Sequence, residues 1–177
     1  RDENMESVNI DLVYGLPKQT IESWTRTIES VIALRPDRMA VYSYAHLPES
    51  QHNQRKINAN DLPRGAAKYE LLALARLKFV QAGYRAIGMD HFALPGDELS
   101  VAVDQRRLSR NFMGYTVKQA PDMIGFGTSA IGEVGGALAQ NEKKLSRYFE
   151  AIEDGRMATA RGTEFTQDDQ IRSWVIR

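Results

Sequence analysis

Carboxylate and imidazole side chains recur at the ends of three predicted strands. Asp11 precedes the turn at 14–17, His46 follows a second apolar run, and Asp90 and His91 follow a third. Such groups can exchange protons, accept hydrogen bonds from hydroxyl or amino groups, or bind a metal ion. In parallel α/β folds the carboxyl ends of the strands border one cavity, so we expect these groups to converge. The competing interpretation is that Asp11 caps a turn and that the histidines satisfy backbone groups.

A metal site made of histidines is not predicted. The separations of His46, His52 and His91 match no compact ligand motif, and His52 lies in a polar segment. Cysteine is absent from the chain. Disulfides, thiolate metal sites, a cysteine nucleophile and an iron–sulfur cluster held by these residues alone are therefore excluded.

Two further segments have possible ligand-binding chemistry. The sequence GFGTSA at 125–130 is similar to a dinucleotide-binding loop but has alanine where the third glycine belongs. It is either a tight turn or a loop whose backbone comes close to a ligand. Arg106, Arg107 and Arg110 could bind carboxylates, form a solvated face or contact nucleic acid. The chain has 23 basic and 23 acidic residues, which disfavours nucleic-acid binding.

The elements that would position these residues alternate in type along the first half of the chain. Apolar alternation predicts a strand at 8–14, helical spacing predicts a helix at 21–34 capped by Thr20, and a second strand is predicted at 39–45. A strand, helix and strand with short connections form a βαβ unit. We therefore expect parallel strands of an α/β barrel or a doubly wound sheet.

The remaining elements are predicted from turn residues and helical periodicity. After a polar loop at 49–60, a helix is expected to open at 61–63 and to end at Gly83, followed by a third strand at 84–89. The buried stripe of this helix is predicted to contain Ala66, Tyr69, Leu72, Ala73, Phe79 and Val80. Downstream we expect a turn at 95–98, polar residues at 100–111, a short strand at 112–117 and a segment rich in small residues at 124–139. A helix is predicted at 142–153, and its apolar face is expected to contain Leu145, Tyr148, Phe149 and Ile152. A last helix is predicted to begin near Thr166 and Asp169.

Read together, several motifs resemble one enzyme family. The sequence NIDLVYGLPKQT at 9–20 is similar to a segment of radical S-adenosylmethionine (SAM) enzymes. The set as a whole resembles the oxygen-independent coproporphyrinogen III oxidases: YAHLP at 44–48, GMDHFA at 88–93, RNFMGYT at 110–116, GFGTSAI at 125–131 and AQN at 139–141. The motifs follow the family's order and cover nearly the whole chain.

The resemblance implies a fold and a division of the chain. The fold would be α/β: the C-terminal half of a radical SAM partial TIM barrel, built of βα units with parallel strands, followed by the start of a mostly helical C-terminal domain. Residues 1–94 would hold the later barrel units, 95–140 a linking segment with a SAM-contacting loop, and 141–177 the truncated helical domain.

The resemblance also implies the chemistry. In the family, a 4Fe-4S cluster on three cysteines cleaves SAM reductively, and the resulting radical removes hydrogen from a propionate of coproporphyrinogen III. Loss of carbon dioxide and one electron leaves a vinyl group, and two rounds give protoporphyrinogen IX in haem biosynthesis. By resemblance, Asp11 and Ala45 contact one SAM and Ile131 contacts a second, while Arg110 is a candidate for binding propionates. No catalytic residue and no metal ligand is assigned in this chain.

The cluster cysteines are expected upstream of these residues, so we expect no oxidase activity from this chain alone. Unpaired edges of an incomplete barrel predict self-association, whereas the whole enzyme is expected to be a monomer. The chain has no apolar run of the roughly 20 residues that a membrane span needs, and residues 1–7 form no apolar leader segment. We therefore expect a cytoplasmic protein that acts on a small molecule, without nucleic-acid or membrane partners.

Two alternatives stay open from the sequence. The first is a haem-binding or haem-transfer relative, in which His46 or His91 would be the axial ligand. The second is a nucleic-acid-binding module, suggested by the capped C-terminal helix near Thr166, which could belong to a winged-helix fold.

Overall fold

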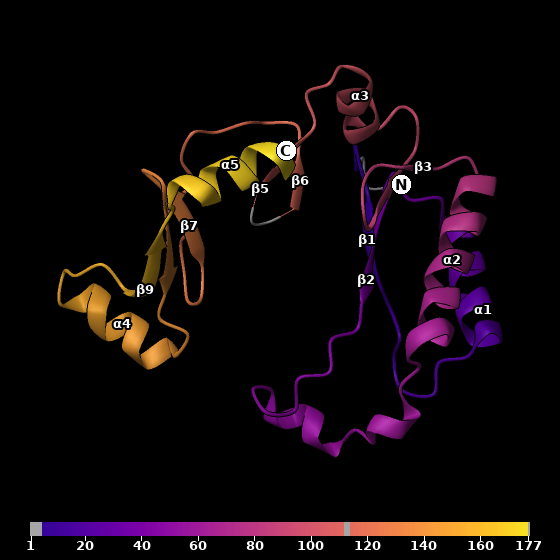
Figure 1. The fold of residues 1–177 in the computed structure, drawn as a ribbon, viewed down its shortest axis with the longest axis horizontal. Coiled ribbons are helices and arrows are strands. Elements are labelled where there is room, and N and C mark those ends of the chain that lie inside the picture. The colour runs from indigo at the N-terminus through magenta and orange to yellow at the C-terminus, as the bar shows by residue number, and fades with distance from the viewer. Residues whose placement is uncertain (1–4, 112–113, 177) are drawn as a thin grey trace. The chain divides into compact units, whose positions relative to one another are not determined.

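The computed structural model describes residues 5–111 and 114–176, and the chain divides into two compact units at 1–107 and 108–177 (Figure 1). The sequence predicted boundaries after residues 94 and 140 instead. The division into residues 1–94, 95–140 and 141–177 was drawn by the expected role of each part, and it stays a prediction.

The first unit is a four-stranded sheet with two long helices. Its elements are β1 (Asn9–Tyr14), α1 (Ile21–Leu34), β2 (Arg38–Ser43), the 3₁₀ turns η1 (His52–Lys56) and η2 (Ala59–Asp61), α2 (Gly65–Gln81), β3 (Arg85–Ala86), β4 (His91–Ala93) and α3 (Glu98–Asp104). The strand order is β1-β2-β4-β3. Strands β1 and β2 are parallel and joined through α1, so the predicted βαβ unit is confirmed.

Helix α1 begins and ends where its sequence predicts. The Thr20 side chain accepts a hydrogen bond from the backbone N–H of Ser23, and the Ser23 hydroxyl accepts one from the Thr20 N–H, which completes a capping box. At the other end Arg35 is left-handed, with φ of 48°, and its N–H bonds to the carbonyls of Val31 and Ile32.

Helices α1 and α2 cover the same face of the sheet, and the core lies between them and the strands (Figure 1). Trp24 is 1% exposed, and its indole N–H donates to the Leu71 carbonyl across the two helices at 2.9 Å. Tyr84 is also buried and donates from its hydroxyl to the Pro36 carbonyl at 2.8 Å. The polar ends of Trp24 and Tyr84 therefore each have a hydrogen-bond partner, as their burial requires.

The predicted buried stripe of α2 is confirmed at Phe79 and in part at Leu72, which is half-buried and packs against the core, and it is wrong at its other positions. The buried residues are Leu71, Ala75 and Phe79, whereas Tyr69 is 70% exposed and Val80 is 49% exposed. Alanine and leucine surround this helix on all sides, so helical periodicity does not choose the face, and packing against α1 decides it. The helix also begins at Gly65 because η2 occupies 59–61.

The third strand predicted at 84–89 is present only as the short β3, and the parallel pairing expected for it is wrong. Strand β3 has two residues, and the strand that pairs with β2 is β4, in the antiparallel sense. Only a short reversal at 87–90 separates β3 from β4, and this is too short for the crossover that a parallel pair needs. The sheet is therefore α/β but mixed.

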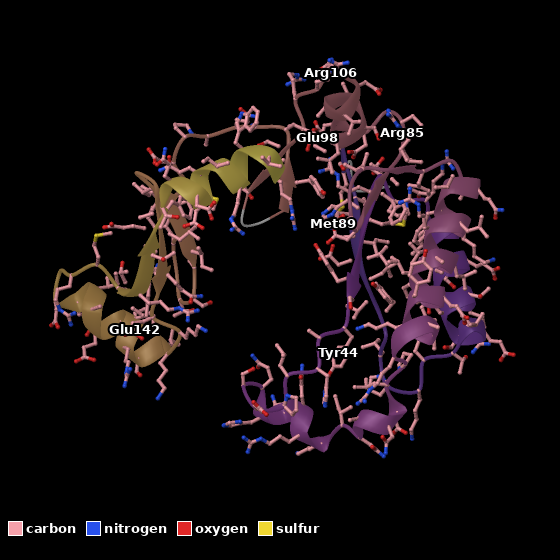
Figure 2. The ribbon with its side chains drawn as sticks, in the orientation of Figure 1. Tyr44, Arg85, Met89, Glu98, Arg106 and Glu142 are labelled. Carbon is pink, nitrogen blue, oxygen red and sulfur yellow. The ribbon has the colours of Figure 1, made fainter. Side chains whose placement is uncertain are left out.

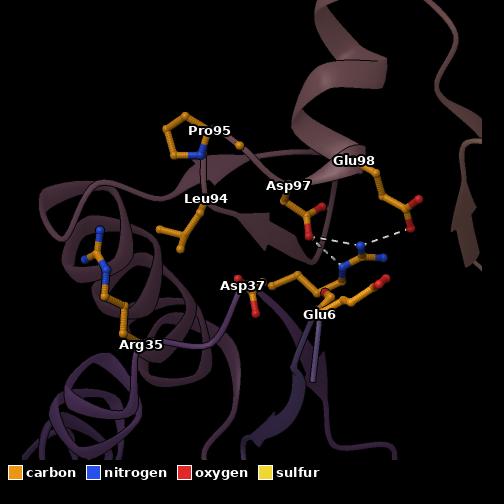
Figure 3. Close-up of a pocket in the computed structure, with 10 residues that line it drawn as sticks. Glu6, Arg35, Asp37, Leu94, Pro95, Asp97 and Glu98 are labelled. Carbon is orange, nitrogen blue, oxygen red and sulfur yellow. Dashed lines mark hydrogen bonds and ion pairs between the residues drawn. The ribbon is translucent and has the colours of Figure 1, made fainter. Parts of the chain in front are cut away.

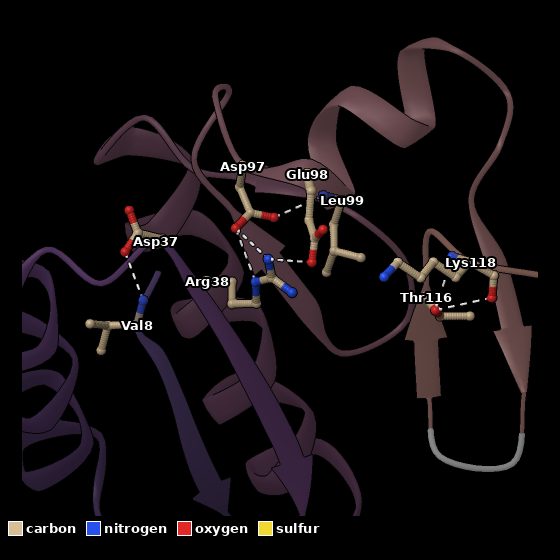
Figure 4. Close-up of polar contacts among 8 residues, drawn as sticks. All are labelled: Val8, Asp37, Arg38, Asp97, Glu98, Leu99, Thr116 and Lys118. Atoms are coloured by element: carbon tan, nitrogen blue, oxygen red, sulfur yellow. Dashed lines mark hydrogen bonds and ion pairs between the residues drawn. The ribbon is translucent and has the colours of Figure 1, made fainter. Parts of the chain in front are cut away.

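The amino end of β2 is tied both to the segment that enters α3 and to the amino end of β1. Arg38 binds the buried Asp97 carboxylate at 2.9 Å and the Glu98 carboxylate at 3.0 Å, and Asp97 caps α3 by accepting from the Leu99 N–H (Figure 4). Asp37 accepts from the Val8 N–H at 2.8 Å. A cavity of about 660 Å³ lies beside these residues (Figure 3). Helix α3 occupies residues for which the sequence predicted only a polar segment.

The second unit contains more strand than predicted. Its elements are β5 (Ser109–Asn111), β6 (Gly114–Thr116), β7 (Ile131–Val134), β8 (Ala137–Asn141), α4 (Leu145–Glu153), β9 (Thr159–Glu164) and α5 (Gln167–Ile176). Strands β7, β8 and β9 form an antiparallel sheet, and β5 pairs with β6. Both helices predicted in 141–177 are present as α4 and α5, and β9, which the sequence did not predict, lies between them and pairs with β8. That the whole domain is mostly helical stays a prediction.

Other predictions for this unit have mixed outcomes. The predicted strand at 112–117 is confirmed at β6, while Phe112 and Met113 lie outside the described residues. The predicted helix at 142–153 is shorter, but the apolar face it was expected to show is present and largely exposed. Among the described residues, no helix is both long and apolar enough to cross a membrane.

Candidate functional site

The open face of the first sheet presents Asp11 beside Tyr42. Alternation along β1 and β2 turns Leu12 and Val41 toward the helices, so Asp11, Val13 and Tyr42 lie on the opposite face. Asp11 is mid-strand, not at the strand end that the sequence predicted. The Asn9 side chain donates to one carboxylate oxygen of Asp11 at 2.8 Å, and Asp11 is exposed. The second carboxylate oxygen is therefore well placed to accept from a ligand.

His91 begins β4, which pairs with β2, and Asp90 directly precedes it. His91 pairs in register with Ala40, and its ring packs edge-on to Tyr42 with centroids 6.2 Å apart. The Asp90 carboxylate contacts the His91 Nδ1 at 2.6 Å, which orients the imidazole. Burial raises the pKa of Tyr42, and the negative charges of Asp11 and Asp90 raise it further.

The segment at 44–48 leaves β2 toward the 3₁₀ turns (Figure 2). The Tyr44 N–H donates to the Tyr14 carbonyl at 2.8 Å, so the carboxyl ends of β1 and β2 continue side by side. Ala45 is exposed, and His46 packs on Tyr44 with ring centroids 6.3 Å apart. Among the described residues, the Tyr44 hydroxyl and the His46 Nδ1 are buried without a hydrogen-bond partner. Unsatisfied buried polar atoms are rare and often mark functional positions.

In the second unit, Ile131 follows the glycine-containing loop at 125–130. A Cβ on Gly125 would lie 2.7 Å from the Ile131 carbonyl oxygen, so only glycine allows this close approach. The Asn141 side chain donates to the carbonyls of Gly125 at 3.2 Å and Gly127 at 2.9 Å. The conformation of the loop is therefore fixed by these contacts. Ile131 lies at the start of β7 and lines a cavity of about 360 Å³ on the sheet.

Arg110 lies on β5, where its guanidinium stacks over the Tyr115 ring at 5.5 Å. Arg110 and Lys118 both line a cavity of about 110 Å³. The backbone N–H of Lys118 donates to the Thr116 hydroxyl at 3.1 Å (Figure 4). Arg110 is half-buried, and stacking of this kind holds a guanidinium in one orientation for a carboxylate.

The structure brings Asp11, Asp90 and His91 near Tyr42, so the predicted convergence is confirmed only in part. It places His46 against Tyr44 instead, and Ile131 in the other unit. Sequence reasoning missed Tyr42. Once β1 and β2 are taken as parallel, their alternation puts Tyr42 on the Asp11 face, so the signal was present.

Comparison with known proteins identifies the family. No family model matches the chain. Oxygen-independent coproporphyrinogen III oxidase from Pseudomonas aeruginosa is 48% identical over 97% of this chain. The enzyme of the same name from Escherichia coli is 46% identical over 100% of it.

The chain belongs to the oxygen-independent coproporphyrinogen III oxidase family. A solved structure of the Escherichia coli coproporphyrinogen III oxidase, described as a radical SAM enzyme, matches 99% of this chain with a TM-score of 0.91 and 46% identity. The chain spans about two fifths of the length of these oxidases: 37% of the Pseudomonas protein and 39% of the Escherichia coli protein.

The residues of this chain offer polar groups of the kind that SAM requires, but they do not offer the ligands of an iron–sulfur cluster. Asp11 offers a carboxylate acceptor on an open face, and the orphaned polar atoms of Tyr44 and His46 flank Ala45. For the cluster, the chain has no cysteine, and the described residues contain no group of three or more His, Cys, Asp or Glu side chains arranged to hold a metal ion. Cluster ligands would have to come from outside these residues.

Proposed function

We propose that these residues form part of a longer enzyme that converts two propionates of coproporphyrinogen III to vinyl groups without oxygen. In each round the SAM-derived radical takes one hydrogen atom, carbon dioxide leaves and one electron passes to an electron acceptor, and two rounds give protoporphyrinogen IX. The observation that carries the proposal is the match of the whole chain to oxidases of this name, at 46–48% identity over 97–100% of its length.

In this proposal the first unit binds one SAM molecule. Reductive cleavage of SAM supplies the carbon radical that removes hydrogen from the substrate. Asp11 accepts from a ribose hydroxyl or from the amino group of SAM through the carboxylate oxygen that Asn9 leaves free. Ala45 contacts the same molecule at the end of β2. These residues bind and orient the cofactor, and the sheet face around Tyr42 helps to exclude water.

The second unit supplies the remaining contacts. Ile131 contacts a second SAM, and the narrow turn at Gly125 lets the backbone approach it. Arg110, held flat on Tyr115, pairs with a substrate propionate.

We also propose a fold, a location and an oligomeric state for the whole enzyme. The β1–α1–β2 unit belongs to a partial TIM barrel, and the enzyme acts in the cytoplasm on a small molecule without nucleic-acid or membrane partners. The whole enzyme is a monomer. A 4Fe-4S cluster is held by cysteines outside this chain.

The test compares this chain with the full-length oxidase that contains it. Both are reconstituted anaerobically with iron and sulfide, supplied with SAM and a reductant, and assayed for 5′-deoxyadenosine and for protoporphyrinogen IX. We expect both products from the full-length protein and neither from the chain alone. SAM-dependent deoxyadenosine from the chain alone, or none from the full-length protein, would overturn the proposal.

A further inference from the structure

The segment that carries Ala45 is held in place by one amide side chain. The Gln54 Nε2 donates to the Ala45 carbonyl at 3.1 Å, and the Gln54 Oε1 accepts from the Leu47 N–H at 2.5 Å. The Gln54 side chain therefore holds the backbone on both sides of His46 by two hydrogen bonds, and we call this pair of hydrogen bonds the grip. A primary amide can donate at one atom and accept at the other, which this arrangement requires.

The grip has a rigid base. Gln54 lies in η1, where its N–H donates to the Gln51 carbonyl at 2.9 Å and its carbonyl accepts from the Ile57 N–H at 3.0 Å. The neighbouring Arg55 donates to the Pro48 carbonyl at 3.1 Å. The 3₁₀ turn and the strand end are thus tied together along several residues.

Lys68 holds the preceding residue from the other side. Its ammonium donates to the Tyr44 carbonyl at 2.8 Å and lies 6.0 Å from the centre of the Tyr14 ring. The side chain crosses Gly15, where an added Cβ would lie 2.7 Å from the Lys68 Cε. Two consecutive carbonyls, those of Tyr44 and Ala45, are therefore fixed by side chains from η1 and α2.

We propose that Gln54 is a positioning residue for SAM binding, acting by fixing the backbone of Ala45 and His46 before the cofactor arrives. This inference rests on the proposed function, because it needs Ala45 to contact SAM. A ligand that meets a preorganised backbone does not lose affinity to ordering it. Removing the grip should therefore weaken SAM binding without removing any atom that touches SAM.

The test uses the full-length oxidase with Gln54→Met, which keeps the length of the side chain and removes both hydrogen bonds. The dissociation constant of SAM is measured by equilibrium dialysis. We expect it to rise roughly tenfold, since one to two net hydrogen bonds are lost. KM for SAM should rise more than KM for the porphyrinogen, a split that general destabilisation would not produce.

Gln54→Glu separates the two halves of the grip. Its carboxylate still accepts from Leu47 but has no hydrogen to donate to the Ala45 carbonyl. We expect amide hydrogen exchange at Leu47 to stay slow in this variant and to become fast in Gln54→Met, while SAM binding is weakened in both.

The matched control is Gln51→Met in the same turn, whose side chain makes no capping hydrogen bond. It should leave the SAM dissociation constant unchanged. Asp11→Ala tests the proposed function separately, because it removes a predicted SAM contact. If Asp11→Ala weakens SAM binding and neither Gln54 variant does, the positioning role is overturned and the proposed function stands. If Asp11→Ala has no effect, the proposed contact of Asp11 with SAM fails, and the Gln54 variants alone then decide the positioning role.

Discussion

Gly15→Ala should be among the most damaging small substitutions at the carboxyl end of β1. Gly15 is buried and has φ of +82°, a conformation that costs alanine about 1–2 kcal/mol. The new Cβ would also lie 2.7 Å from the Lys68 Cε. Displacing this side chain loses the bond from its ammonium to the Tyr44 carbonyl, which is worth about 1.5–3 kcal/mol for a charged donor. The sum is a loss of about 2.5–5 kcal/mol in the free energy of unfolding.

The matched control is Gly83→Ala. Gly83 has a similar φ of +90°, but no atom lies within 4 Å of its added Cβ. It should therefore lose only the backbone cost of about 1–2 kcal/mol. The difference between the two variants isolates the contribution of Lys68.

The assay is denaturant unfolding of the chain followed by tryptophan fluorescence. The chain has two tryptophans, Trp24 at 1% exposure and Trp174 at 81% exposure. In a Trp174→Phe background the signal comes from the core between α1 and α2. In a Lys68→Ala background, Gly15→Ala should cost no more than Gly83→Ala. The reasoning is refuted if Gly15→Ala and Gly83→Ala cost the same with Lys68 present.

Three further predictions concern the open face, the loop and the assembly. The pKa of Tyr42 is raised in the folded protein, so its neutral phenol contributes to stability. That stabilisation is fully present below the ordinary tyrosine pKa and is lost as the pH rises through the raised pKa of Tyr42. Asp11→Asn should lower the pKa of Tyr42 without restoring the ordinary tyrosine value, because burial is the larger cause of the raised pKa. The pKa is measured by titrating the absorbance at 295 nm and subtracting the titration of the Tyr42→Phe variant. An unchanged pKa of Tyr42 would contradict this prediction. Asn141→Ala should destabilise the second unit by about 1–3 kcal/mol and speed amide exchange at 125–131, since two carbonyls lose their donor; slow exchange there would contradict the role of Asn141. Size-exclusion chromatography of the chain alone should show concentration-dependent self-association, because apolar side chains such as Phe126 are exposed; a stable monomer would contradict it.

Sequence patterns succeeded where one local signal was sufficient. Helix α1 has a polar cap at Thr20 and an apolar stripe of limited width, so both its bounds and its buried face were predictable. In α2, leucine and alanine lie all round the helix. Which of them is buried depends on the neighbouring helix, and a single sequence does not contain that information.

Turns explain the missed strands. Strands β7 and β8 are joined by Gly135 and Gly136, both with positive φ, as in the two-residue hairpin turns that favour glycine. That signal was readable, but residues 124–139 were described only as rich in small residues, and no strand was predicted there. At 87–90 the reversal was not apparent, because Ile87 and Met89 continue the apolar pattern of the strand predicted at 84–89.

The candidate site was predictable in its residue types more than in its geometry. Asp11, Asp90 and His91 were expected together, and they lie around Tyr42. The grip of Gln54 was not predictable, because it joins residues through a polar loop that has no periodicity.

The central claim is that the open face of the first sheet binds SAM through Asp11. The most direct test is the SAM dissociation constant of the full-length oxidase and of its Asp11→Asn variant, measured by equilibrium dialysis at neutral pH. A charge-assisted hydrogen bond is lost while the side chain keeps its shape, so the constant should rise roughly tenfold or more. The unfolding curve of the variant should stay close to that of the unchanged protein. An unchanged dissociation constant in a folded variant would contradict the assignment of this face to SAM.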